Sequence, residues 1–160
     1  MLDNLRVLFL LGNNLSGSIP QEVGTMRSLR VLVLADNFLN VAIPASIGNL
    51  SQLRELYLYN NSLFGSIPEE LGLLKHVFVV QLERNNLSGP IPASIGKLIA
   101  SYKLDLCQNE LSGSIPNIFE NLTQLTILSL SKNKLSGSIP TTVGKLTKLA
   151  TLFYFCPKTI

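Results

Sequence analysis

Apolar residues return at a fixed interval of 24 residues along the chain. The residues that open successive units are Leu2, Met26, Leu50, Leu74, Leu98, Leu122 and Leu146. Regular self-similarity at such a period is typical of solenoids, in which each unit packs only on its neighbours. We therefore predict one repeat domain at 1–152, with six full repeats and a partial seventh from position 146, followed by a divergent tail at 153–160.

The first half of each unit predicts a short strand followed by a turn. In Leu56-Tyr57-Leu58 the alternation has a period of two, so the leucines should point inward and Tyr57 outward. Equivalent strands should then stack into a parallel sheet. Each full unit next carries an asparagine at the turn, namely Asn13, Asn37, Asn61, Asn85, Asn109 and Asn133. Because an amide offers two donors and two acceptor lone pairs, we expect a ladder of buried amides to satisfy the turn backbone.

The second half of each unit predicts a turn and a short helix. Gly17 allows a tight or positive-φ conformation, and Pro20 suits an edge or a turn. The closing Val23-Gly24 pair predicts a short helical turn and its stop.

The unit L-x-x-L-x-x-L-x-L-x-x-N-x-L-x-G-x-I-P-x-x-L-G-x resembles the plant-specific class of leucine-rich repeats. Segments 15–20 and 135–140 carry the resemblance most clearly, and it extends from Leu2 to about Leu152. The predicted fold class is an α/β solenoid. It is a right-handed leucine-rich-repeat superhelix with a parallel β-sheet on the concave face and a 3-10 or irregular convex side.

Several positions depart from the repeat. Val41 replaces the glycine of the second repeat, which predicts a wider or strained turn. Ser101 replaces a leucine and predicts a thinner core, while Glu120 replaces the closing glycine. In the last unit Tyr154 falls at an inward leucine position and Pro157 at the asparagine position. Because neither end shows the cysteine-containing caps of plant relatives, we expect an internal fragment or truncated gene product. A complete short protein remains the alternative.

Composition and charge exclude several classes of protein. Hydrophobic residues make up 46% and charged residues 14% of the chain, which favours a folded domain over disorder. The net charge of +3 comes from scattered residues without a Lys/Arg run, so we expect no nucleic-acid partner. No apolar run approaches the roughly 20 residues that span a bilayer, so no direct membrane insertion by this chain is expected. The N-terminus lacks the layout of a signal peptide.

No arrangement of residues predicts catalysis or metal binding. Cys107 and Cys156 should lie two strands apart, about 9–10 Å, whereas a disulfide needs Cα atoms within about 7 Å, so we predict no bond between them. The lone His76 has no partner at metal-ligand spacing and is expected on the surface. Without a nucleophile–base pair, paired carboxylates or a phosphate loop, we expect no catalytic residue, metal or cofactor.

Five asparagines lie in N-x-S/T motifs and are candidate N-glycosylation sites in a secretory setting. They are Asn14, Asn49, Asn60, Asn86 and Asn121. The repeat itself offers the alternative explanation, because N-N-L-S and N-L-T are words of its consensus.

Outward strand positions vary from repeat to repeat while the framework does not, so the fold does not dictate these residues. The richest patch is the predicted ligand-binding site, and it consists of Tyr57, Tyr59, Gln81, Glu83, Arg84 and Asp105. Tyrosine supplies large contact area and a hydroxyl, and it is enriched in binding hot spots. An ordinary solvated sheet face is the alternative. Arg6, Arg30 and Arg54 share one repeat position and could hold a carboxylate-bearing ligand, or form a solvated flank.

The resemblance implies a non-catalytic module that recognises a protein or peptide. We expect a fragment of the ectodomain of a plant receptor-like kinase or receptor-like protein, acting in signalling or defence at the extracellular side of the plasma membrane. Its partners would be a peptide or protein ligand and a co-receptor, and any kinase activity would lie in a domain outside this chain. The alternatives are an inhibitor of a cell-wall enzyme, similar to polygalacturonase-inhibiting proteins, and a truncated remnant without independent function.

Overall fold

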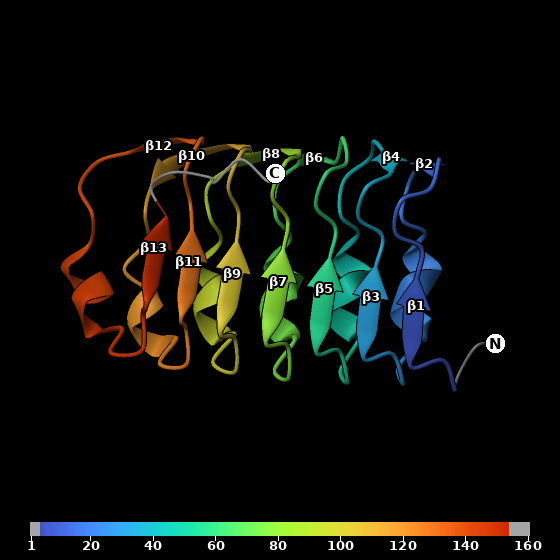
Figure 1. The fold of residues 1–160 in the computed structure, drawn as a ribbon, viewed down its shortest axis with the longest axis horizontal. Helices are drawn as coiled ribbons and strands as arrows, with labels where there is room; N and C mark the ends of the chain where they lie inside the picture. The colour runs from blue at the N-terminus through green and yellow to red at the C-terminus, as the bar shows by residue number, and fades with distance from the viewer. Residues whose placement is uncertain (1–3, 154–160) are drawn as a thin grey trace.

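Seven parallel strands form one sheet that runs the length of the molecule (Figure 1). The computed structural model of the chain describes residues 4–153. The strands, in spatial as well as chain order, are β1 (Val7–Phe9), β3 (Val31–Val33), β5 (Glu55–Tyr57), β7 (Val79–Gln81), β9 (Lys103–Asp105), β11 (Ile127–Ser129) and β13 (Thr151–Phe153). Each pairs with the next at equivalent repeat positions, for example Leu32 with Leu56. The predicted parallel sheet is confirmed.

Short 3-10 helices form the opposite side of the solenoid, behind the sheet in Figure 1. They are η1 (Gln21–Thr25), η2 (Ala45–Asn49), η3 (Glu69–Leu73), η4 (Ala93–Lys97), η5 (Phe119–Asn121) and η6 (Thr141–Lys145). Leu56 and Leu58 point between the two layers and are fully buried, whereas Tyr57 between them is only partly buried. One continuous apolar core therefore fills the solenoid, and the α/β solenoid prediction holds with 3-10 helices on the convex side.

A second set of strands follows the asparagine turns, along the upper rim in Figure 1. These strands are β2 (Ser16–Gly17), β4 (Phe38–Leu39), β6 (Phe64–Gly65), β8 (Asn86–Gly89), β10 (Glu110–Ser114) and β12 (Lys134–Ser136). They form one sheet of β2 and β4 and another that runs from β6 to β12. The pattern of apolar residues does not predict this rim.

The rim is interrupted at the repeat in which Val41 replaces glycine. Gly17 and Gly65 occupy the same position in the flanking repeats with φ of 80° and 79°, a conformation that a β-branched residue strongly disfavours. Val41 does not adopt it, and β4 ends at Leu39 without pairing to β6. The turn predicted to be wider or strained therefore has a different backbone conformation from the turns of the flanking repeats. As a result, the second set of strands is divided between β4 and β6.

The asparagine side chains join neighbouring repeats through the backbone. Asn85 Nδ2 donates to the carbonyls of Leu82 in its own repeat (3.1 Å) and Leu58 in the preceding one (3.0 Å). Its Oδ1 accepts the N–H of Leu63 at 3.0 Å. The same three kinds of bond recur at Asn37, Asn61, Asn109 and Asn133. Each amide thus binds the turns of two successive repeats together.

The closing glycines do not stop the helices, so this part of the sequence interpretation is wrong. Gly72 is the fourth residue of the five in η3 and has no left-handed φ. A Cβ at Gly72 would lie 2.3 Å from the carbonyl oxygen of Ser94 in η4. The position is glycine because successive 3-10 helices pack in close contact. Where Glu120 replaces it, η5 has only three residues, and the carboxylate pairs with Lys145 Nζ at 2.6 Å.

The other departures have local outcomes. Ser101 is buried, and its Oγ donates to the carbonyl of Lys103 at 3.2 Å, so a polar contact replaces the missing leucine packing. His76 is exposed, as predicted. Tyr154, Cys156 and Pro157 lie outside the described residues, so the disulfide prediction for Cys107 stays a prediction, as does the domain boundary at residue 152. Among residues 4–153, no helix has the length and apolar character needed to cross a membrane.

Candidate binding site on the seven-stranded sheet

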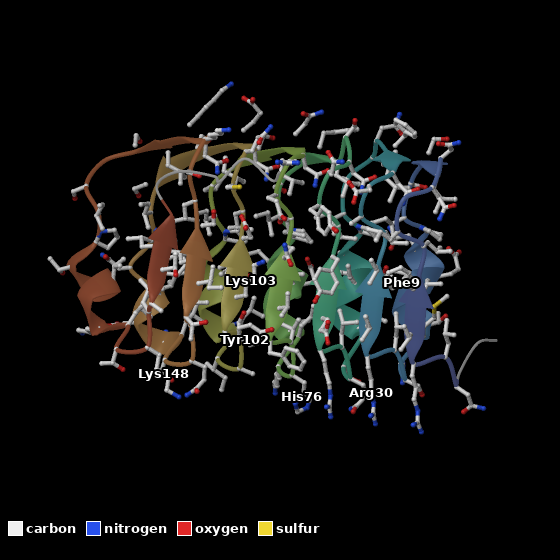
Figure 2. The ribbon with its side chains drawn as sticks, in the orientation of Figure 1. Phe9, Arg30, His76, Tyr102, Lys103 and Lys148 are labelled. Carbon is white, nitrogen blue, oxygen red and sulfur yellow. The ribbon has the colours of Figure 1, made fainter. Side chains whose placement is uncertain are left out.

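The outward face of the seven-stranded sheet contains a hollow of about 700 Å³. All six residues of the predicted ligand-binding site line it, namely Tyr57, Tyr59, Gln81, Glu83, Arg84 and Asp105. Phe9 and Lys103, labelled on this face in Figure 2, line it as well. The structure therefore brings the predicted residues together in one concave surface, while their role in binding stays a prediction.

Strand register explains this convergence. Tyr57, Gln81 and Asp105 are direct partners on β5, β7 and β9. Tyr59 and Glu83 lie two residues beyond the ends of β5 and β7, and their side chains line the same side of the sheet. Adjacent side chains along this row are separated by one strand spacing, about 4.8 Å.

Three charged residues of the hollow were missed by the sequence analysis: Asp36, Glu55 and Lys103. Glu55 and Lys103 occupy the first outward position of their strands, in register with the apolar Val31 and Val79. Comparing this position from repeat to repeat in the sequence would have shown the two charged residues. Asp36 precedes a ladder asparagine, in a turn that no strand pattern covers, and its φ is 53°. Strand register places Glu55 and Lys103 in the hollow, and the conformation of a turn places Asp36 there.

Hydrogen bonds within the hollow orient its polar side chains. Tyr57 Oη donates to Glu55 Oε2 at 2.7 Å, and Gln81 Nε2 donates to Glu83 Oε1 at 2.8 Å. Burial, followed by this bond to Glu55, raises the pKa of Tyr57 above its usual value of 10. Burial raises the pKa of Tyr59, and the nearby negative charges of Asp36 and Glu83 raise it further. Both phenols therefore remain protonated at neutral pH, and the proton of Tyr57 is held by Glu55.

Glu83 is the most perturbed carboxyl group of the hollow. Burial, followed by repulsion from Asp105, raises its pKa to about 7, and the bonds from its own backbone N–H and Gln81 together with the charge of Lys103 only partly oppose this. Its Oε2 is buried without a hydrogen-bond partner in the part of the chain that the structure describes. A ligand group that donates a hydrogen bond or carries positive charge would satisfy this oxygen.

Replacing Glu83 by Gln is expected to flatten the pH dependence of stability. Because folding raises the pKa of Glu83 from 4.5 to about 7, the folded state holds the proton more tightly. The group's contribution to stability is thus complete below about pH 4.5 and is lost as pH rises to 7. Between pH 5 and pH 8, the free energy of unfolding measured in urea should fall less for the variant than for the parent chain. The difference should be at most about 3 kcal/mol.

The exposed Glu22→Gln variant is the control for this experiment and should follow the parent protein. If the free energy of unfolding changed with pH equally in the parent chain and in Glu83→Gln, folding would not shift the pKa of Glu83.

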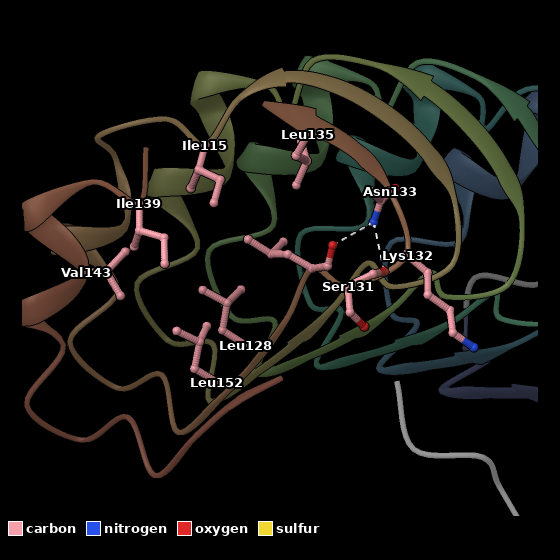
Figure 3. Close-up of a pocket in the computed structure, with 10 residues that line it drawn as sticks. Ile115, Leu128, Ser131, Lys132, Asn133, Leu135, Ile139, Val143 and Leu152 are labelled. Carbon is pink, nitrogen blue, oxygen red and sulfur yellow. Dashed lines mark hydrogen bonds between the residues drawn. The ribbon is translucent and has the colours of Figure 1, made fainter. Parts of the chain in front are cut away.

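A second, apolar pocket of about 130 Å³ lies in the last repeats (Figure 3). Leu128, Ile115 and Ile139 in its wall occupy framework positions of the repeat, which the fold itself requires. Asn133 at its edge donates to backbone carbonyls, as the other ladder amides do. This pocket is part of the solenoid core, whereas the hollow over the sheet is lined by positions that vary between repeats. The hollow is therefore the better candidate for recognition.

The candidate glycosylation sites are all exposed, namely Asn14, Asn49, Asn60, Asn86 and Asn121. Exposure is what attachment of a glycan requires, and the modification itself stays a prediction. Among residues 4–153, no group of His, Cys, Asp and Glu side chains is placed to hold a metal ion.

Comparison with known proteins agrees with this architecture. A model of leucine-rich repeat regions matches residues 4–159, and no curated protein matches the chain. The ectodomain of the Arabidopsis receptor kinase HAESA, solved with the peptide hormone IDA and the co-receptor SERK1, has 42% identity and a TM-score of 0.89 over 92% of this chain. The ectodomain of the receptor kinase GASSHO1/SCHENGEN3 from Arabidopsis thaliana, solved with CASPARIAN STRIP INTEGRITY FACTOR 2, has 36% identity and a TM-score of 0.89 over 91%.

The Arabidopsis thaliana BIR2 ectodomain is also similar, with 34% identity and a TM-score of 0.72 over 81% of this chain and 68% of its own. The chain spans only 25% of the HAESA chain and 17% of the GASSHO1/SCHENGEN3 chain in those structures. The predicted resemblance to plant-type leucine-rich repeats is confirmed.

Proposed function

Because the chain belongs to the leucine-rich repeat family, we propose that it is a non-catalytic recognition module that binds a peptide in the hollow over its seven-stranded sheet. The observation that carries this proposal is the placement of Tyr57 and Tyr59 beside the unpartnered, buried Oε2 of Glu83. The tyrosines offer apolar area and hydroxyl oxygens that can accept hydrogen bonds, and Glu83 Oε2 can accept a hydrogen bond that no described residue supplies.

The relatives support a finer statement. HAESA was solved with a peptide hormone and a co-receptor, and it shares 42% of residues with this chain. We therefore propose that the chain is part of the ectodomain of a plant receptor kinase or receptor-like protein, on the extracellular side of the plasma membrane. A co-receptor would join the peptide complex, and the signalling activity would belong to a separate domain.

Changing Tyr57 and Tyr59 to Ala should weaken peptide binding at least tenfold with little change in stability. Both side chains are only partly buried and face the hollow rather than the core, so their loss removes contact area for the ligand. The immobilised chain would be exposed to a pooled library of secreted plant peptides, and retained peptides would be identified by mass spectrometry and titrated against both proteins.

The control variant is Phe64→Ala, which removes an exposed aromatic side chain from β6 on the rim. It should bind the same peptides as the parent chain. Retention that is equal for the parent chain and the double tyrosine variant, or no peptide retained above an empty matrix, would overturn the proposed function.

A further inference from the structure

Positive charge gathers on one edge of the seven-stranded sheet. The segments that lead from each 3-10 helix into the next strand run along this edge, the lower one in Figure 1, where Figure 2 shows Arg30, His76 and Lys148. We call it the basic edge, defined by Arg6, Arg27, Arg30, Arg54, Lys75 and Lys148. These are six of the 13 Lys and Arg residues of the chain. They look scattered in the sequence because they come from five different units of the repeat.

The basic edge carries no compensating acidic residue within the described chain. Segments 4–6, 26–30, 50–54, 74–78, 98–102, 122–126 and 146–150 contain neither Asp nor Glu. The ion pairs among residues 4–153 join Lys134 to Glu110 and Lys145 to Glu120, so none of them involves the edge. Of the described carboxylates nearest in sequence, Glu55 lines the hollow on the sheet face, and Glu22 and Glu70 lie in η1 and η3. The edge is therefore a strip of cations that form no ion pair with any residue from 4 to 153.

The backbone holds this strip at a fixed spacing. The carbonyl of Arg6 accepts the N–H of Arg30 at 2.7 Å, and the carbonyl of Arg30 accepts that of Arg54 at 2.8 Å. The series continues from Arg54 to Phe78 at 2.8 Å and from Phe78 to Tyr102 at 2.9 Å. One repeat position is thus presented five times in a row, about 4.8 Å apart, on a hydrogen-bonded base.

The chemistry of this row changes halfway along it. Arg6, Arg30 and Arg54 occupy its first three places, and Phe78 and Tyr102 the next two. The two rings stack with centroids 5.8 Å apart, and 42% of Tyr102 is exposed. A uniform polyanion would find its anionic groups matched only in the first part of the row. A polypeptide of mixed sequence matches both parts, because it can place carboxylates against guanidinium groups and an apolar side chain against the rings.

We infer that the basic edge binds an extended segment of a partner protein in which acidic residues lie next to an aromatic one. Four strand spacings of about 4.8 Å span about 19 Å, which an extended chain covers with about six residues at about 3.3 Å each. The acidic part lies over Arg6, Arg30 and Arg54, and the aromatic part lies over Phe78 and Tyr102. This surface is separate from the hollow that the proposed function uses.

The ion pairs between the partner's acidic residues and the arginines of the basic edge would be exposed to solvent. Each is therefore weak and is screened by salt. Affinity therefore depends on several contacts made together, and it should fall steeply between about 0.05 and 0.3 M salt, where the Debye length shrinks to less than half.

A labelled peptide of about eight residues, with three Glu followed by two Phe, tests the inference by fluorescence anisotropy. Arg30→Ser/Arg54→Ser should weaken its binding about tenfold or more at low salt. The matched control is Lys132→Ser/Lys134→Ser, which removes the same two charges from exposed positions outside the basic edge and should change binding less than about threefold. Tyr102→Ser should weaken this peptide but not a version with Ser in place of Phe. Tyr57→Ala/Tyr59→Ala should leave it unchanged, so failure here is distinct from failure of the proposed function.

Equal weakening by the two double variants would show that only net charge matters and would overturn the inference. Tighter binding of polygalacturonate than of the peptide, without dependence on Tyr102, would assign the edge to an acidic polysaccharide. Retention on phosphatidylserine vesicles in preference to the peptide would assign it to a membrane surface. Circular dichroism and urea unfolding of every variant would establish that lost binding is not lost folding.

Discussion

Asn85→Ala should lower the free energy of unfolding by about 2–4 kcal/mol. The side chain accepts the N–H of Leu63 and donates to carbonyls of two repeats, at Leu58 and Leu82. Alanine leaves the buried Leu63 N–H without this acceptor and also leaves a void where the amide lay. Because the bonds connect successive turns, the loss weakens the interface between repeats that a solenoid depends on. Urea unfolding followed by circular dichroism measures the change.

The neighbouring Asn86 offers a control of the same residue type. Its side chain is exposed, so Asn86→Ala should change stability by less than about 0.5 kcal/mol. If the two alanine variants were equally stable, the ladder amides would not hold the repeats together.

Gly72→Ala should cost about 3 kcal/mol, for a reason unrelated to backbone conformation. The added Cβ would lie 2.3 Å from the carbonyl oxygen of Ser94 and 2.6 Å from its Cβ. Both obstacles belong to the backbone or its first side-chain atom, so no rotation relieves the clash, and η3 and η4 have to move apart. A Ser or a longer residue should be at least as damaging.

The same substitution at the last repeat should have the opposite sign. Gly144 occupies the equivalent position in η6, and a Cβ there meets no atom of the described residues within 4 Å. Since neither glycine has a left-handed φ, Gly144→Ala should restrict only the unfolded chain and stabilise the protein by about 0.4–1 kcal/mol. Thermal unfolding of both variants decides the matter, because a loss of stability at both positions would mean that helix contact is not the cause.

The fixed repeat length explains why much of the candidate site could be predicted from the sequence. With no insertion between units, Tyr57, Gln81 and Asp105 had to fall on one row of the sheet, and the strand register confirms that they do. The pKa of Glu83 could not be predicted in the same way. It depends on burial and on the charge of Asp105, which comes from the next strand, and neither is a property of the local sequence.

Other features are invisible in the pattern because they arise between repeats. Ser16 and Gly17 form strand β2 only because the previous turn places them beside β4, and neither residue type favours a strand. The turn residue before the ladder asparagine takes a positive φ whether it is Gly12, Asn60 or Gln108, so residue type carries no signal there. In each case the neighbouring unit, rather than the residue itself, imposes the conformation.

The interruption at Val41 has a mechanical consequence. Along the stretch from β6 to β12, a force that pulls the ends of the solenoid apart is shared by two hydrogen-bonded sheets, whereas between β4 and β6 only the seven-stranded sheet is continuous. Hydrogen bonds across that junction are fewer, so between β2 and β12 the stiffness of the solenoid should be lowest there. Under tension the solenoid should bend at this junction and separate there into its first two repeats and the remainder.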